Sequence, residues 1–167
     1  LMSEKVDFEK LQELVSEVCT EDQKKEIIDS LLSVYKDSLS NKEAYDLLIQ
    51  LAVEKTSVQN PEWQFVGAKF LLDYIYRTIC SNRNLSKVYT NLYELIENLT
   101  AQGVYGNYLL ESYTKTEINQ LQSLLNKEND LLFNYTGLKL LYNRYLKKDM
   151  NGNLQEAPQE RFMIIAM

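Results

Sequence analysis

The sequence contains no histidine and only two cysteines, Cys19 and Cys80. The cysteines lie far apart and no CxxC pair is present, so these residues assemble neither a zinc site nor a Cys-His nucleophile. A GxSxG nucleophile elbow, a GxGxxG turn and a GxxxxGK[ST] phosphate loop are absent as well. The residue types therefore indicate a segment without a catalytic site, in which both thiols pack as small hydrophobes.

Turn-forming residues are also scarce. Five glycines and two prolines in 167 residues are too few for the frequent turns of a β-sandwich. Hydrophobic residues make up 45% of the chain and charged residues 25%, which is typical of a globular protein. We therefore expect a mainly α fold.

Long apolar runs and concentrated positive charge are missing too. No apolar run approaches the roughly 20 residues that span a bilayer, and residues 1–8 lack the basic-then-apolar order of a signal peptide. The net charge is −6, and lysine and arginine are scattered along the chain. We expect a cytoplasmic protein with neither a nucleic-acid nor a membrane partner.

Apolar residues at helical spacing predict four helices in the first half. Asp7 is expected to cap the first helix, a turn ending at Asn41 precedes the third, and Pro61 starts the fourth. The fourth is apolar around much of its circumference, so it should lie centrally among the others. Residues 1–78 thus form a predicted four-helix unit, with helices at residues 8–19, 21–38, 42–55 and 62–80.

Residues 79–167 are predicted to form a second helical region. Apolar spacing indicates a helix that ends before Gly103, and Thr114 with Glu117 has the pattern of a capping box. Helical spacing then runs through residues 130–146. The dipeptide Asn151-Gly152 predicts one short β-hairpin around residues 145–156.

A last helix is expected after Ala157-Pro158-Gln159. Its apolar residues, up to Met167, have nothing after them to complete a buried helix of ordinary length. The chain is therefore expected to be cut from a longer enzyme.

Two other features suggest chemistry only weakly. The carboxylate pairs Glu13/Glu17 and Glu94/Glu97 fall one helical turn apart, a spacing that suits a metal if a facing helix adds ligands, but also suits a solvated face. The 12 tyrosines are spread over nearly all predicted helices, which favours core and interface positions over radical or stacking roles.

The order of motifs in the second half is specific. It runs from Gly106-Asn107-Tyr108-Leu109-Leu110 through Asn134-Tyr135-Thr136-Gly137-Leu138-Lys139 to Glu156-Ala157-Pro158-Gln159. This order and spacing resembles the N-terminal helical region of the large catalytic subunit of aerobic class I ribonucleotide reductase, over roughly residues 84–167.

The first half resembles the ATP-cone, the regulatory nucleotide-binding module of that family, most clearly at Asn60-Pro61-Glu62-Trp63. The family module begins with a hairpin whose basic strand contacts the nucleotide, and this chain starts after that strand. The resemblance implies ATP or dATP contacts for Glu4, Lys10 and Arg77. The two cations would neutralise phosphate oxygens, and Glu4 would accept a hydrogen bond from the ribose or base. The alternative is that all three are ordinary surface charges.

The resemblance also implies a ribonucleoside-diphosphate reductase as the parent enzyme. Its effectors would be ATP and dATP, and its partners a radical-generating small subunit and a second large subunit. The family's reactive cysteines lie in a barrel beyond the matched region, and neither Cys19 nor Cys80 matches them. The segment is therefore expected to be inactive alone, with regulation and scaffolding as its roles.

Two other hypotheses remain. One is that the chain is a free-standing helical adaptor that binds protein partners. The other is that its first half is a degenerate ATP-cone that has kept only a packing role. A stop codon directly after Met167 would indicate the adaptor, whereas calorimetry with ATP and dATP separates a degenerate module from a working one.

Overall fold

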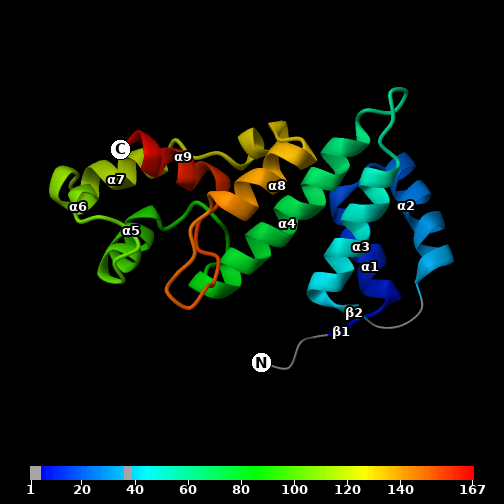
Figure 1. Ribbon diagram of the computed structural model, residues 1–167, viewed down its shortest axis with the longest axis horizontal. Coiled ribbons are helices and arrows are strands. Elements are labelled where there is room, and N and C mark those ends of the chain that lie inside the picture. The colour runs from blue at the N-terminus through cyan, green and yellow to red at the C-terminus, as the bar shows by residue number, and fades with distance from the viewer. Residues whose placement is uncertain (1–4, 36–38) are drawn as a thin grey trace. The chain divides into compact units, whose positions relative to one another are not determined.

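The computed structural model describes residues 5–35 and 39–167, and the described part is mainly helical, as predicted (Figure 1). In chain order its elements are β1 (Lys5–Val6), α1 (Phe8–Val18), α2 (Glu21–Val34), β2 (Leu39–Ser40), α3 (Asn41–Glu54), α4 (Trp63–Arg83), α5 (Leu92–Ala101), α6 (Tyr108–Ser112), α7 (Lys115–Gln122), the 3-10 helix η1 (Lys127–Leu132), α8 (Tyr135–Arg144) and α9 (Pro158–Ala166). None of the described helices is both long and apolar enough to cross a membrane.

The chain divides into two compact units, which are described separately. The first unit comprises residues 1–74, of which Lys5 is the first described, together with Phe133–Lys139. The second comprises Ile75–Leu132 and Leu140–Met167. Helices α4 and α8 each contribute residues to both units. The contribution of residues 133–139 to the first unit was not foreseen from the sequence.

Helices α1, α2, α3 and the first part of α4 build the first unit around an apolar core. Leu11, Ile27, Leu48 and Phe70, one from each helix, are completely buried. Asp7 caps α1 as predicted, because its carboxylate accepts a hydrogen bond from the Lys10 amide at 3.0 Å. The periodic apolar pattern of these helices thus becomes one shared core.

A strand pair in the first unit was not predicted. β1 and β2 pair antiparallel, with Lys5 opposite Ser40 and Val6 opposite Leu39. Val6 is buried, and Ser40 ends β2 and also caps α3, where its hydroxyl and the Glu43 carboxylate form a capping box. Two residues per strand are too few for the alternating pattern by which sequence reasoning finds strands.

Helices α5, α6 and α7 and the last helix, α9, share the core of the second unit. Its buried members are Leu92, Leu95, Ile96, Leu99, Tyr105, Leu109, Ile118 and Ile164. The last helix is thus partly buried within this unit, through Ile164, whereas Phe162 and Ile165 are exposed. Thr114 caps α7 with the predicted capping box.

Two predictions in the second half need correction. The stretch 130–146 is not one helix, because η1 ends at Leu132 and α8 begins at Tyr135, after Asn134 accepts a hydrogen bond from the Gly137 amide. The hairpin after α8 has a single bridge, between Lys148 and Leu154, and no extended strands. Gly152 has a φ of +84°, as glycine permits, but Asn151 does not have a positive φ, so the turn is not the two-residue type I′ turn that Asn-Gly favours.

Candidate functional site

The structure does not show a cluster of the three residues predicted to contact a nucleotide. Glu4 lies outside the described residues. Lys10 is a partly buried residue of α1 in the first unit, and Arg77 is an exposed residue of α4 in the second. Both take part in interactions within the chain. Nucleotide contact by these residues stays a prediction.

The carboxylate pairs gather no further metal ligands. Among residues 5–35 and 39–167, no group of three or more His, Cys, Asp or Glu side chains could hold a metal ion. Cys19 and Cys80 are both partly buried, and burial raises the pKa of each thiol, for Cys19 to about 11. A thiol with a raised pKa stays protonated at neutral pH and is a poor nucleophile.

The most constrained polar site is the buried carboxylate network of the second unit, formed by Asp130, Glu156 and Glu160. Each of these side chains is at most 1% exposed. They are the buried charged residues of the part of the chain that the structure describes. A buried carboxylate is tolerated only when hydrogen bonds and cations replace its water, so its partners are informative.

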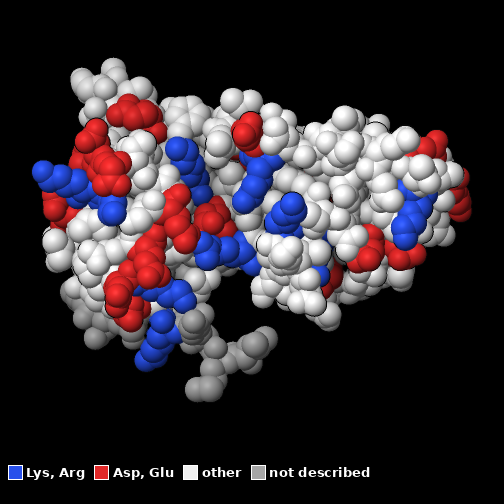
Figure 2. Space-filling view, turned by 180° about the vertical axis from the view of Figure 1, so that it is seen from behind, with Lys and Arg blue, Asp and Glu red and all other residues white. Residues whose placement is uncertain are grey.

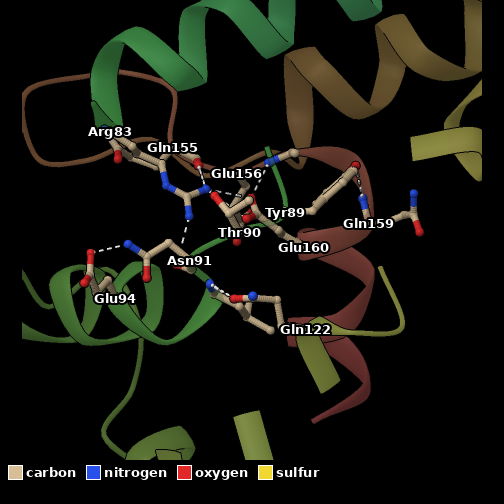
Figure 3. Close-up of polar contacts among 12 residues, drawn as sticks. Arg83, Tyr89, Thr90, Asn91, Glu94, Gln122, Gln155, Glu156, Gln159 and Glu160 are labelled. Atoms are coloured by element: carbon tan, nitrogen blue, oxygen red, sulfur yellow. Dashed lines mark hydrogen bonds and ion pairs between the residues drawn. The ribbon is translucent and has the colours of Figure 1, made fainter. Parts of the chain in front are cut away.

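Glu160, in the first turn of α9, pairs with Arg83 at the end of α4. Nη1 of Arg83 lies 2.9 Å from both carboxylate oxygens, and the two side chains are 7% and 0% exposed. Arg83 also donates to the backbone oxygens of Gln155 and Asn91, at 3.1 and 3.0 Å (Figure 3). Glu160 in turn accepts from the Ala157 amide at 2.8 Å. The pair thus joins the ends of α4 and α9 to the segment before α5.

Glu156, just before α9, receives hydrogen bonds from three directions. The Tyr105 hydroxyl donates to Oε1, the Lys147 amide donates to Oε2 at 2.8 Å, and Arg161 lies 3.1 Å from Oε1. Glu156 thereby fixes the hairpin, the loop before α6 and the first turn of α9 to one another.

Asp130, in η1, accepts hydrogen bonds from two tyrosines on the same oxygen. Both the Tyr76 and Tyr89 hydroxyls donate to Oδ2, and Gln159 Nε2 donates to Oδ1 at 3.1 Å. The Tyr89 hydroxyl also accepts from the Gln159 amide at 3.2 Å. Lys127 lies over the Tyr76 ring, 4.6 Å from its centroid. Asp130 thus ties the 3-10 helix η1 to α4, to the segment before α5 and to α9.

Burial dominates the electrostatics of the network. It raises the pKa of Asp130, Glu156 and Glu160 above their ordinary values, although the hydrogen bonds and arginines oppose the shift. Burial also raises the pKa of the tyrosines that donate to them, so these hydroxyls stay protonated and remain donors. Such a set of satisfied, buried groups suits holding elements in place.

A polar cavity of about 290 Å³ lies beside the network, within the second unit. Its walls include Arg83, Asn91, Glu94, Asp149 and Gln155. Asp149 accepts from the Asn151 and Asn153 amides, both at 2.9 Å, and Glu94 accepts from the Asn91 side chain. These wall groups thus already satisfy one another. On the face shown in Figure 2, Lys and Arg are scattered among Asp and Glu.

Sequence reasoning missed this network, although it contains residues of the motifs that carry the family resemblance. Glu156 and Gln159 were identified as residues of a family motif, not as groups that contact distant side chains. The usable signal was Glu156-Ala157-Pro158-Gln159-Glu160-Arg161, which carries three charged residues and directly precedes the apolar run of residues 162–166. Their partners are distant in sequence, at Arg83 and Tyr105. No spacing rule connects them.

Comparisons with known proteins agree with the resemblance. Residues 131–167 match the family described as the ribonucleotide reductase all-alpha domain. The chain is 35% identical over 134 residues, 80% of its length, to a ribonucleoside-diphosphate reductase subunit alpha of Helicobacter pylori. It is 31% identical over 146 residues to the same subunit of Treponema pallidum, and 28% identical over 143 residues to that of Enterobacteria phage T4. The matches span 16%, 17% and 18% of these relatives' lengths.

Proposed function

Because the chain belongs to the family of ribonucleoside-diphosphate reductase alpha subunits, as a counterpart of their N-terminal region, we propose that it serves regulation and scaffolding in such an enzyme. The enzyme would act in the cytoplasm and reduce ribonucleoside diphosphates to deoxyribonucleotides for DNA synthesis. Its partners would be a radical-generating small subunit and a second large subunit. The catalytic residues would lie outside these 167 residues.

The scaffolding part of the proposal rests on one observation. The residues that match the all-alpha family, 131–167, contain Glu156 and Glu160, and these two carboxylates bind the segment to α4 and to the loop before α6. A polar network that is buried, satisfied and shared by several elements fixes one arrangement of them. A segment fixed in this way could hold a neighbouring catalytic domain in a defined position.

The regulatory part rests on the resemblance of residues 1–78 to an ATP-cone. Lys10 and Arg77 would bind the phosphates of ATP or dATP, and Glu4 a hydroxyl or base group. Cations pair with phosphate through charge-assisted hydrogen bonds, so removing either one should weaken binding by about tenfold or more.

The regulatory proposal is tested by isothermal titration calorimetry with ATP and dATP. The wild type is compared with Lys10→Ala and Arg77→Ala, and Lys25→Ala in α2 is the control, since it removes an exposed cation elsewhere in the first unit. Weaker binding in both test variants but not in the control supports the proposal. Equal affinity in all four proteins contradicts the residue assignment, and no heat with either nucleotide contradicts effector binding by this chain.

The enzymatic part has a separate test. The complete polypeptide encoded by the gene is assayed for reduction of ribonucleoside diphosphates with its small subunit. Activity that dATP inhibits in the wild type, but not in Arg77→Ala, supports both parts together. A reading frame that stops at Met167 would favour the helical adaptor instead.

A further inference from the structure

The tip of the hairpin after α8 combines a reactive dipeptide with an exposed turn. Asn151 and Gly152 are both exposed, and Gly152 adopts a φ of +84°, the left-handed region that favours glycine. A Cβ added at Gly152 would meet no atom within 4 Å, so the space around the Gly152 backbone is open. From this geometry we propose that Asn151 is a site of spontaneous deamidation, with water as the co-reactant.

The reaction needs only the two residues, a base and water. The Gly152 amide nitrogen loses its proton to solvent base and attacks Cγ of Asn151, forming a C–N bond and expelling ammonia. The resulting five-membered succinimide takes up one water molecule. Its ring opens at either carbonyl, giving aspartate or isoaspartate at position 151. No oxidant, metal or enzyme is required; hydrolysis regenerates the Gly152 N–H, and position 151 gains one carboxylate and therefore one negative charge.

Glycine after asparagine makes the attack feasible. With no side chain on its Cα, Gly152 lets its nitrogen approach the asparagine carbonyl, whereas a larger residue crowds that approach. Asn151-Gly152 is the single Asn-Gly pair in the sequence. Asn153, two residues further in the same turn and also exposed, is followed by the buried Leu154. Asn153 therefore serves as an internal control.

Several hydrogen bonds of the turn oppose the reaction. The Gly152 amide donates to the Asp149 carbonyl at 3.0 Å, and this bond must open before the nitrogen attacks. The tip is also held by hydrogen bonds from the Asp149 amide to the Asn153 carbonyl, at 2.9 Å, and from the Met150 amide to Gln102 Oε1, at 3.1 Å. None of these bonds belongs to the backbone ladder of a helix or strand, so the tip opens locally. The Asn151 backbone amide donates to the Asp149 carboxylate at 2.9 Å, and this bond must open as well for the tip to rearrange.

The product would change the turn. Isoaspartate adds one carbon to the main chain and moves Gly152 away from Asp149. The new carboxylate, whether of aspartate or isoaspartate, belongs to a residue two positions from Asp149, whose pKa is held below its usual range chiefly by the Asn153 side chain. Two neighbouring anions repel, so the modified turn loses hydrogen bonds that now satisfy Asp149.

The test is peptide mapping by mass spectrometry after the folded chain is incubated at mildly alkaline pH in heavy-oxygen water. We expect conversion at Asn151 with one heavy oxygen incorporated, an isoaspartate fraction larger than the aspartate fraction, and conversion at Asn153 slower by about tenfold or more, which corresponds to ~1.4 kcal/mol in barrier. Conversion of Asn151 no faster than that of Asn153 overturns the proposal.

Two variants complete the test. Gly152→Ala should slow conversion at position 151 by about tenfold, and it leaves the Asn153-Leu154 control site intact. Because alanine at positive φ distorts the turn, a second variant, Asn151→Gln, is measured beside it. The longer glutamine side chain would have to form a six-membered ring, so position 151 of that variant should stay unmodified. Unchanged conversion at 151 in Gly152→Ala, or conversion in Asn151→Gln as fast as in the wild type, contradicts the mechanism.

Discussion

The two units of this chain are built differently. In the described part of the first unit, no charged side chain is fully buried, and the core consists of residues such as Leu11, Leu48 and Phe70. The second unit has an apolar core as well, but it also buries Asp130, Glu156 and Glu160. The first unit therefore depends on apolar burial, whereas the second depends in addition on a polar network that must be complete.

This difference changes the expected response to substitution. Losing one methyl group from an apolar core leaves a small cavity, and its cost depends on how well the site relaxes. Losing one partner of a buried ion pair leaves an unpaired charge without water, which no small relaxation repairs. Single polar changes should thus damage the second unit selectively. The one tryptophan, Trp63, is buried in the first unit and reports on it by fluorescence.

The largest effect is expected from Glu160→Ala. The variant leaves the Arg83 guanidinium buried and removes the acceptor of the Ala157 amide, so the second unit should lose about 3–5 kcal/mol of stability. Amide hydrogen exchange should rise in α5, α7 and α9. Glu111→Ala, an exposed glutamate of α6, is the control. An equal rise in α1 to α3 would show that the two units do not respond separately.

Leu48→Ala tests the first unit. Leu48 is completely buried, so the substitution should cost ~3 kcal/mol through lost burial and a cavity, and the Trp63 fluorescence transition should shift to lower urea. Leu32→Ala, at a 64% exposed position of α2, should cost much less. A similar shift for both would contradict the apolar core described for this unit.

Tyr105→Phe removes one hydroxyl from the network and changes little volume. Glu156 would keep Lys147 and Arg161 but lose a buried donor, at a cost of about 1–3 kcal/mol. Tyr108→Phe, at a 55% exposed position, is the matched control and should be near neutral. Urea denaturation followed by circular dichroism measures both. Equal stability of the two variants would mean that the Tyr105 hydroxyl does not support the network.

The stability of the protein should depend on pH through the buried carboxylate Asp130. Burial raises the pKa of Asp130 in the folded state, so the native protein binds this proton more tightly than the unfolded chain. The stability gained from this protonation is fully present below the ordinary pKa of an aspartate and is lost as pH rises through the raised pKa of the folded state. The stability of the wild type relative to Asp130→Asn should therefore fall with rising pH across that window. A flat difference would contradict the raised pKa.

The smallest difference between the units is expected at the helix caps. Ser40→Ala before α3 and Thr114→Ala before α7 each remove the hydroxyl of a capping box and should cost about 1 kcal/mol. Thr116→Ala, an exposed position within α7, is the control. Thermal denaturation should show similar losses for both caps. A much larger loss for Thr114→Ala would indicate that the second unit amplifies even local changes.

The sequence was most informative where structure is local. Asp7 and Thr114 were identified from rules that span a few residues, and their predicted capping roles are confirmed. The interruption between η1 and α8 was missed, because apolar residues at helical spacing occur on both sides of Asn134. The β1 and β2 pairing was missed because each strand is two residues long. Both depend on contacts that periodicity does not encode.

The sequence by itself determined the mainly helical fold and the family, since apolar period, capping residues and motif order are properties of the chain alone. Only the tertiary structure decided that Arg83 meets Glu160, that Tyr76 and Tyr89 share Asp130, and that residues 133–139 join the first unit. The physical reason is that burial sets the cost of a charge, and burial depends on segments that lie 41 to 77 residues apart in sequence.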